Sequence, residues 1–137
     1  MNDAEFEEQK ARVLAVFEKW SVPLWLEGYD TTFYWERTKG PERKMEGGDT
    51  HWQTTLKVNS NWTHMDAAIT AYLGTIMNVT EVELETAVVH ECMHILVCET
   101  RQGEDKGDDW LDHEERVCTM LAKAFMTVRQ YAKEGKL

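Results

Sequence analysis

The sequence predicts an α+β fold in which an N-terminal helix, a three-stranded sheet, a motif-bearing helix and a C-terminal helix form one domain over residues 1–137. Three observations support this prediction. Apolar residues recur at helical spacing near both ends of the chain, β-branched and aromatic residues gather between them, and a capped apolar segment follows. A hydrophobic content of 42% with six Trp indicates a folded core rather than disorder.

The first helix is predicted from Asn2 and Asp3 followed by Glu5, a typical helix start. One face of this segment is apolar and comprises Phe6, Val13, Leu14, Phe17 and Trp20. The helix is therefore expected to run to about Trp20, where Pro23 soon prevents its continuation.

Three strands are predicted between the helices. Residues 31–35 are β-branched and aromatic, residues 52–59 alternate in polarity, and the Ala-rich residues 67–73 form the third segment. Residues 39–49 contain Gly-Pro and Gly-Gly pairs among charged residues, which predicts a connecting loop.

Two further helices are predicted in the second half of the chain. Thr80 and Glu83 match a capping box before a largely buried helix, and the polar residues 99–109 predict a loop after it. Asp108 or Asp109 is expected to cap the last helix. Its predicted buried face comprises Val117, Cys118, Leu121, Phe125 and Val128.

The motif in the first of these helices is His-Glu-Cys-Met-His at residues 90–94, the pattern H-E-x-x-H. A spacing of four places His90 and His94 on one face of a helix, where both rings can bind one Zn²⁺ and Glu91 can act as general base. The alternative is a buried helix with two hydrogen-bonded histidines and an accidental glutamate. Because each buried polar group needs a partner, this alternative is the less economical interpretation.

A catalytic zinc site generally has a third protein ligand. Val97 and Thr100 stand where a metzincin would have Gly and His, which excludes that class. Glu114 and Glu115, at the start of the last helix, are the candidates, followed by His113. Helical phase favours Glu114 over Glu115, because Glu114 shares the stripe that is predicted to face the core.

Charge and cysteine usage limit the classes of function. A formal net charge of −10 argues against binding to nucleic acid or anionic membranes. No segment is long and apolar enough to span a bilayer, and the acidic N-terminus does not resemble a signal peptide, so a cytoplasmic location is expected. Cys92, Cys98 and Cys118 are expected to be buried, reduced thiols.

Residues 90–94 and the segment His-Glu-Glu-Arg-Val-Cys-Thr-Met-Leu-Ala at residues 113–122 resemble the small gluzincin-like metallopeptidases, or minigluzincins. The likeness is strongest to their short phage- and prophage-type members. The resemblance implies a zincin-like fold, one Zn²⁺ per chain held by His90, His94 and either Glu114 or Glu115, and a general base at Glu91. Cys92 and Met93 depart from the bulkier aliphatic residues usual at their positions.

The resemblance also implies how a substrate would bind. The strand at residues 67–73 would lie at the sheet edge and pair with an extended peptide or protein substrate. A monomer is expected. Four side chains are open as candidates to stabilise the oxyanion: Tyr34, Tyr72, His51 and His64.

Two other functions compete with a zinc endopeptidase. The chain could be a zincin-fold module that binds zinc or a peptide without turnover, as its small size suggests. It could also be a metal-free interaction domain that uses its six Trp as a partner surface, although Trp residues are more often found in protein cores.

Overall fold

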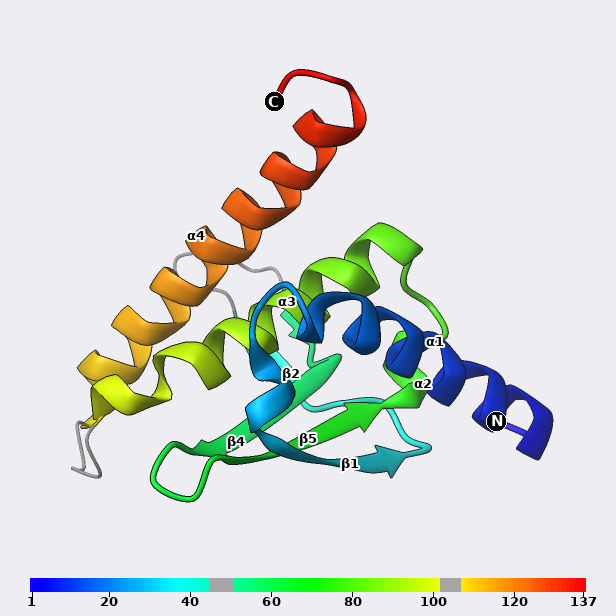
Figure 1. Ribbon diagram of the computed structural model, residues 1–137. Coiled ribbons are helices and arrows are strands. Elements are labelled where there is room, and N and C mark those ends of the chain that lie inside the picture. The colour runs from blue at the N-terminus through cyan, green and yellow to red at the C-terminus, as the bar shows by residue number, and fades with distance from the viewer. Residues whose placement is uncertain (45–50, 102–106) are drawn as a thin grey trace.

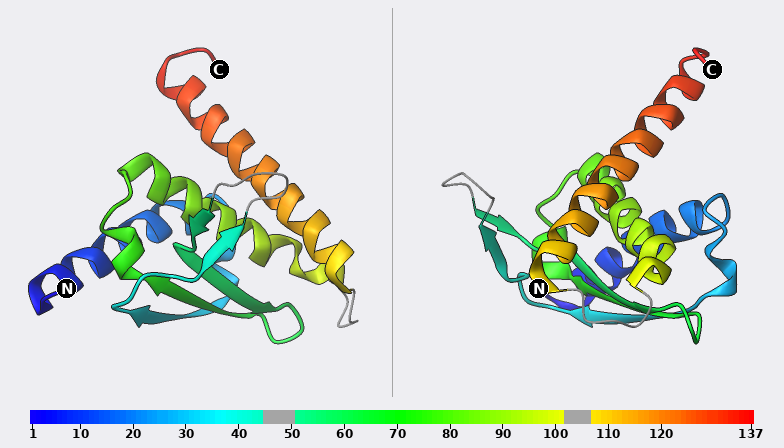
Figure 2. Two further views of the ribbon diagram at one scale, coloured as in Figure 1. Left: turned by 180° about the vertical axis from the view of Figure 1, so that it is seen from behind. Right: turned by 90° about the vertical axis from the view of Figure 1, so that its left-hand side faces the viewer.

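The computed structural model describes residues 1–44, 51–101 and 107–137 and has an α+β architecture. A three-stranded mixed sheet forms one layer, and helices α1 and α3 lie together on one of its faces (Figure 1). Helix α4 packs across α3, and its C-terminal part extends beyond the rest of the molecule (Figure 2). The α+β prediction is therefore confirmed.

Helix α1 (Asp3–Ser21) begins as the sequence predicts. Asn2 and Glu5 form a complete capping box, and both acids of the first turn favour the positive end of the helix dipole. Val13 and Trp20 are buried, and Phe6 and Phe17 pack against the core from its edge. A short 3₁₀ helix, η1 (Leu26–Gly28), then leads into the sheet.

The sheet has the strand order β1-β5-β4, made of β1 (Asp30–Glu36), β4 (Leu56–Asn61) and β5 (Asp66–Tyr72). β5 pairs in parallel with β1 and antiparallel with β4. The expected strands at residues 31–35 and 67–73 are thus confirmed. The expected edge position of residues 67–73 is wrong, because β5 forms a hairpin with β4 and also pairs with β1 on its other side.

The region between β1 and β4 differs from the prediction. The expected strand at residues 52–59 is divided into β3 (His51–Gln53) and β4, and β3 pairs with β2 (Glu42–Lys44) in a separate two-stranded sheet. The predicted loop at residues 39–49 therefore contains a strand. Its remainder at residues 45–50 lies outside the described residues.

Helix α3 (Glu81–Val97) is the central helix, and the short helix α2 (Leu73–Ile76) precedes it. Thr80 caps α3 through the predicted box with Glu83, in which each side chain accepts the other residue's backbone N–H. Its apolar side chains fill the space between the sheet and α4, and those fully buried include Leu84, Val89, Cys92, Met93 and Ile95. The 3₁₀ helix η2 (Cys98–Arg101) ends this segment.

Helix α4 (Gly107–Lys133) is the longest element. Asp108 and Asp109 lie inside it, so neither is the predicted cap. Part of the predicted loop at residues 99–109 is therefore helical, and residues 102–106 lie outside the described part of the chain. No helix among the described residues has the length and apolarity that crossing a bilayer requires.

The buried face of α4 is rotated from the predicted one. Cys118 is buried as expected, but Val117 is 48% exposed and Val128 is 53% exposed. Ala122 is buried instead, and Glu114 is buried as predicted. Helical periodicity predicted an apolar face on α4. Because α4 contacts α3 only along a narrow line, much of the apolar surface of α4 stays exposed.

Candidate metal centre

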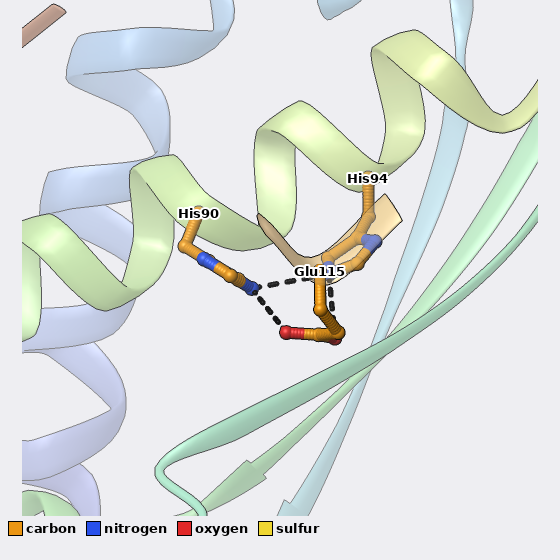
Figure 3. A group of neighbouring side chains, drawn as sticks. All are labelled: His90, His94 and Glu115. Atoms are coloured by element: carbon orange, nitrogen blue, oxygen red, sulfur yellow. Dashed lines mark hydrogen bonds and ion pairs between the residues drawn. The ribbon is translucent and has the colours of Figure 1, made fainter. Parts of the chain in front are cut away.

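His90 and His94 face the same side of α3 because they are four residues apart, slightly more than one helical turn. They point toward the start of α4, where Glu115 lies opposite them (Figure 3). The His94 side chain is only 9% exposed, whereas those of His90 and Glu115 are partly open to solvent. The group is thus fixed by two packed helices and still accessible from one side.

The three side chains converge closely (Figure 3). The two Nε2 atoms are 3.1 Å apart. The Glu115 carboxylate bridges the two rings, with Oε2 3.2 Å from His90 Nε2 and Oε1 3.0 Å from His94 Nε2. Two ring nitrogens and a carboxylate thus gather at one point.

Glu115, and not Glu114, belongs to this group, which reverses the preference drawn from helical phase. The phase argument correctly predicted that Glu114 is buried, since its residue is only 6% exposed. Its Oε1 lies 3.6 Å from His94 Nδ1, on the other side of that ring. The two histidines lie at the rim of the helix contact, where Glu115 reaches them from a half-buried position.

The Nδ1 atoms of both histidines face second partners. His90 Nδ1 lies 3.4 Å from Thr119 Oγ1, and His94 Nδ1 faces Glu114. Contacts of this kind fix ring orientation and present the opposite nitrogen, Nε2, to a metal. Thr119 was not singled out from the sequence as a ring-holding residue, although it follows Glu115 by one helical turn.

Burial alone would lower the pKa of His94, but hydrogen bonds to Cys118 and Glu115 raise it to about 10. In the metal-free protein this ring therefore holds a proton at neutral pH. A proton and a metal ion compete for the same nitrogen lone pair, so metal binding here would release the proton.

The donor set fits zinc. Two imidazoles and one carboxylate form the His₂Glu set of a class of catalytic zinc sites. With bonds of about 2.0–2.1 Å, neighbouring ligand atoms of a tetrahedral zinc site lie about 3.3 Å apart. The two Nε2 atoms are 3.1 Å apart, and each lies near a different oxygen of the Glu115 carboxylate, at 3.0 and 3.2 Å. With one ligand atom taken from each residue, the three atoms lie within 4.8 Å of one another. These three residues could hold a metal ion.

Glu91 lies next to His90 on α3 but faces the sheet. It borders a small cavity whose other lining residues are apolar, namely Val13, Phe17, Phe33, Leu56, Ile69 and Val88. Burial raises the pKa of Glu91 to about 7, although His90, His94 and a backbone hydrogen bond from Val58 act in the opposite direction. A carboxyl group with a pKa near neutrality is well matched to moving a proton at neutral pH.

The hydrogen bond from Val58 to Glu91 shows that β4 is the sheet edge that faces this part of α3. Tyr72 donates its backbone N–H to the Thr55 carbonyl, and antiparallel pairs alternate between bonded and non-bonded positions. The backbone groups of Leu56, Val58 and Ser60 therefore point away from β5. The side of β4 that no other described strand pairs with lies next to Glu91, and α3 packs against this strand.

Other residues considered from the sequence lie elsewhere or are not described. His113 and His64 are exposed, and Tyr34 is exposed on β1. No hydrogen bond joins Tyr34, Tyr72 or His64 to the three-residue group among the described residues, and the side chain of His51 is outside them. The three cysteines, Cys92, Cys98 and Cys118, are free and buried as expected.

Comparison of this chain with protein-family models, with curated protein sequences and with solved structures finds no match. The likeness to the minigluzincins accordingly rests on residues 90–94 and 113–122 alone.

Proposed function

We propose that this protein is a zinc-dependent metallopeptidase with a zincin-like arrangement of its active-site helix and glutamate helix. One observation carries the proposal: the H-E-x-x-H helix and a downstream glutamate, 21 residues after His94 in the sequence, bring His90, His94 and Glu115 together. Three side chains from two helices converge and offer the donor types of a zinc site, which an accidental motif would not require.

Each site residue has a distinct role in the proposed reaction. His90, His94 and Glu115 hold the metal, which when bound supplies the Lewis acidity that polarises a peptide carbonyl and makes water more acidic. Glu91 accepts the proton from the attacking water and passes it to the leaving nitrogen. Its apolar surroundings keep its pKa near neutrality, so that it can perform both transfers.

The substrate is proposed to bind as an extended peptide along the side of β4 that no other described strand pairs with. This side replaces the edge that was expected at β5. The outward backbone groups of Leu56 and Ser60, together with the Val58 carbonyl, supply donors and acceptors for such pairing, while the Val58 N–H bonds to Glu91. Their position beside Glu91 would place a paired peptide next to the general base.

The test is peptide hydrolysis by the Glu91→Gln variant. We expect it to retain zinc and to lose at least about 100-fold in kcat/KM on a mixed peptide library, because general acid–base catalysis contributes about 10²–10⁴-fold. Glu81→Gln on the same helix is the matched control, since the Glu81 side chain is 71% exposed and far from the group in sequence. Undiminished cleavage by zinc-loaded Glu91→Gln would refute the assignment.

A second candidate is a module that holds zinc or a peptide without turnover. It is favoured because, among the described residues, none of the candidates for oxyanion stabilisation, Tyr34, Tyr72 and His64, forms a hydrogen bond with His90 or His94. This candidate predicts one zinc per chain and no cleavage of the library. Efficient cleavage by the wild-type protein would exclude it.

A further inference from the structure

The face of the three-stranded sheet that lies opposite α1 and α3 is polar. Phe33 points to the helix side, where its ring packs against Phe17 of α1, and the even-numbered residues of β1 alternate with it and are exposed. The strand register then places the outward side chains in three rows across β1, β5 and β4: Asp30, Asp66 and Asn61; Thr32, Ala68 and Asn59; Tyr34, Thr70 and Lys57. No helix of the described chain lies over this face in any view (Figures 1 and 2).

A hollow of about 390 Å³ lies over the first two rows and reaches Tyr34 in the third. Its floor includes Ala68, whose methyl group is smaller than the side chains of Thr32 and Asn59 on either side. The volume falls within the range of about 300–1,000 Å³ that is usual for ligand sites. We call it the sheet hollow, and the side chains that make it polar are those of Asp30, Thr32, Tyr34, Asn59, Asn61 and Asp66.

The two carboxylates of the sheet hollow lie side by side. Asp30 and Asp66 are direct neighbours in the parallel register, and neither side chain forms an ion pair with a cation of the described chain. Like charges at neighbouring positions destabilise a sheet. These two acceptors are therefore costly to the fold and available to a ligand.

Asn61 adds a fixed donor beside them. Its Oδ1 accepts the backbone N–H groups of Thr63, at 3.0 Å, and His64, at 3.3 Å. The side chain is thereby held in place next to Asp66, and its Nδ2 group is the part left to donate. Because the Asn61 oxygen is already used, this end of the hollow offers only two carboxylates, whereas Ca²⁺ takes about 6–8 oxygen ligands.

The mixture of donors and acceptors distinguishes between classes of organic ligand. An amine or guanidinium would use the two carboxylates but would leave the amide and hydroxyl donors without an acceptor. A sugar carries adjacent hydroxyl groups that each donate and accept, so it can satisfy both kinds of group at once. The formal net charge of −10 disfavours acidic sugars. The ring of Tyr34, which is 55% exposed, offers an apolar surface for the C–H groups of a sugar ring.

We propose that the sheet hollow is a binding site for a neutral saccharide. Asp30 and Asp66 accept hydrogen bonds from its hydroxyl groups, Asn61 donates one, and Tyr34 packs against its ring. The candidate metal centre lies between α3 and α4, and the sheet hollow lies on the face of the sheet opposite α3. The inference is therefore independent of the proposed peptidase function and goes beyond it.

Titration of the full-length protein with maltose, cellobiose and N,N′-diacetylchitobiose, followed by amide NMR, tests this proposal. We expect saturable shifts at residues 30–34, 59–61 and 66–68 with at least one of the three. Asp30→Ala should weaken binding at least about tenfold, because it removes hydrogen bonds to a charged group. Glu36→Ala is the matched control, since Glu36 is an exposed carboxylate on the same face of β1 outside the hollow, and it should bind like the wild type.

A second variant tests the hollow itself. Ala68→Leu fills the floor and should abolish the saturable shifts, while circular dichroism shows that each variant is folded. Binding of a neutral saccharide should change little between low and high salt, whereas binding of Nα-acetyl-lysine amide would weaken as salt screens the carboxylates.

Three outcomes would overturn the proposal. Saturable, salt-sensitive binding of Nα-acetyl-lysine amide without binding of any saccharide would make the hollow a site for a cation. Wild-type protein that binds none of the probes would show that the hollow is only a polar surface. Saccharide binding that persists in both Asp30→Ala and Ala68→Leu would place the site elsewhere.

Discussion

Helix α3 carries two polar clusters close together in sequence, and their charges are balanced in different ways. At the first, Glu85 accepts hydrogen bonds from Lys19 Nζ and Trp20 Nε1, each at 2.8 Å, and forms an ion pair with Arg129. We call this group the Glu85 junction. At the second, two ring nitrogens and the Glu115 carboxylate converge.

The difference is consistent with the proposal that only the second cluster binds a metal. The protein's own cations balance Glu85, and the junction ties α1 and α4 to α3. At the candidate metal centre, hydrogen bonds to Cys118 and Glu115 raise the pKa of His94 to about 10, so that this ring holds a proton instead of a balancing cation. The Glu85 junction is complete as it stands, whereas the metal centre can exchange its proton for a metal ion.

The largest expected effect is on zinc affinity, and it differs between substitutions of the two neighbouring glutamates of α4. Glu115→Gln should weaken zinc binding by more than about 100-fold, because it removes a ligand. Glu114→Gln should weaken it by about 10–100-fold, as is usual for a residue that orients a liganding histidine. Competition with a chromophoric chelator measures both values. An equal or reversed order would contradict the assignment of Glu115.

Removing the charge of Glu85, at the Glu85 junction, should lower the stability of the protein without changing its zinc affinity. Glu85→Gln should lower the free energy of unfolding by about 2–3 kcal/mol, since hydrogen bonds to charged groups contribute about 1.5–3 kcal/mol each. Zinc affinity should stay the same. Denaturant unfolding measures the change, and the exposed Glu81→Gln should cost less than about 1 kcal/mol. A loss of zinc affinity in Glu85→Gln would show that the clusters are coupled.

The two clusters should respond to pH in opposite directions in zinc-free protein. Burial alone would raise the pKa of Glu85, but hydrogen bonds from Arg129, Lys19 and Trp20 lower it to about 2. Its contribution to stability is therefore present above its ordinary pKa of 4.5 and lost as the pH falls toward about 2. The Glu85→Gln variant should lose this acid-dependent component.

The contribution of His94 has the opposite sign. Its pKa is raised from 6.5 to about 10, so its contribution is fully present below pH 6.5 and lost as the pH rises through about 10. Zinc must displace this proton, so apparent zinc affinity should rise about tenfold per pH unit near neutrality. Chelator competition at several pH values measures the slope. A flat profile would mean that zinc binds without displacing the His94 proton.

The smallest expected effect concerns Thr119. Its Oγ1 lies 3.4 Å from His90 Nδ1, near the long limit for a hydrogen bond. Thr119→Val should therefore weaken zinc binding less than about tenfold, below the effect of Glu114→Gln. The same competition assay ranks the two variants. A larger loss of zinc affinity in Thr119→Val than in Glu114→Gln would mean that zinc binding depends more on the orientation of the His90 ring than on that of His94.

Local signals in the sequence predicted local structure well. The capping boxes at Asn2 and Thr80 mark the starts of α1 and α3, because each depends on residues three positions apart. The H-E-x-x-H spacing likewise placed His90 and His94 on one face. These features need no knowledge of which elements become neighbours in the fold.

Features that depend on packing between elements were not predictable in the same way. Phase showed that Glu114 is buried, but the choice of Glu115 depends on where α4 crosses α3. Helical periodicity predicted that Val117 and Val128 share one apolar face of α4, but not that both side chains would remain exposed. The central position of β5 depends on pairing with β1, which no local pattern records.

The central claim is that His90, His94 and Glu115 bind one zinc ion. The most direct test is the metal content of protein purified without chelator, combined with X-ray absorption at the zinc edge. We predict one zinc per chain with two histidine nitrogens and carboxylate oxygen as protein ligands, a signal that Glu115→Gln changes and Glu85→Gln preserves. Protein that contains no zinc, takes none up and unfolds at the same temperature with or without it would contradict the claim.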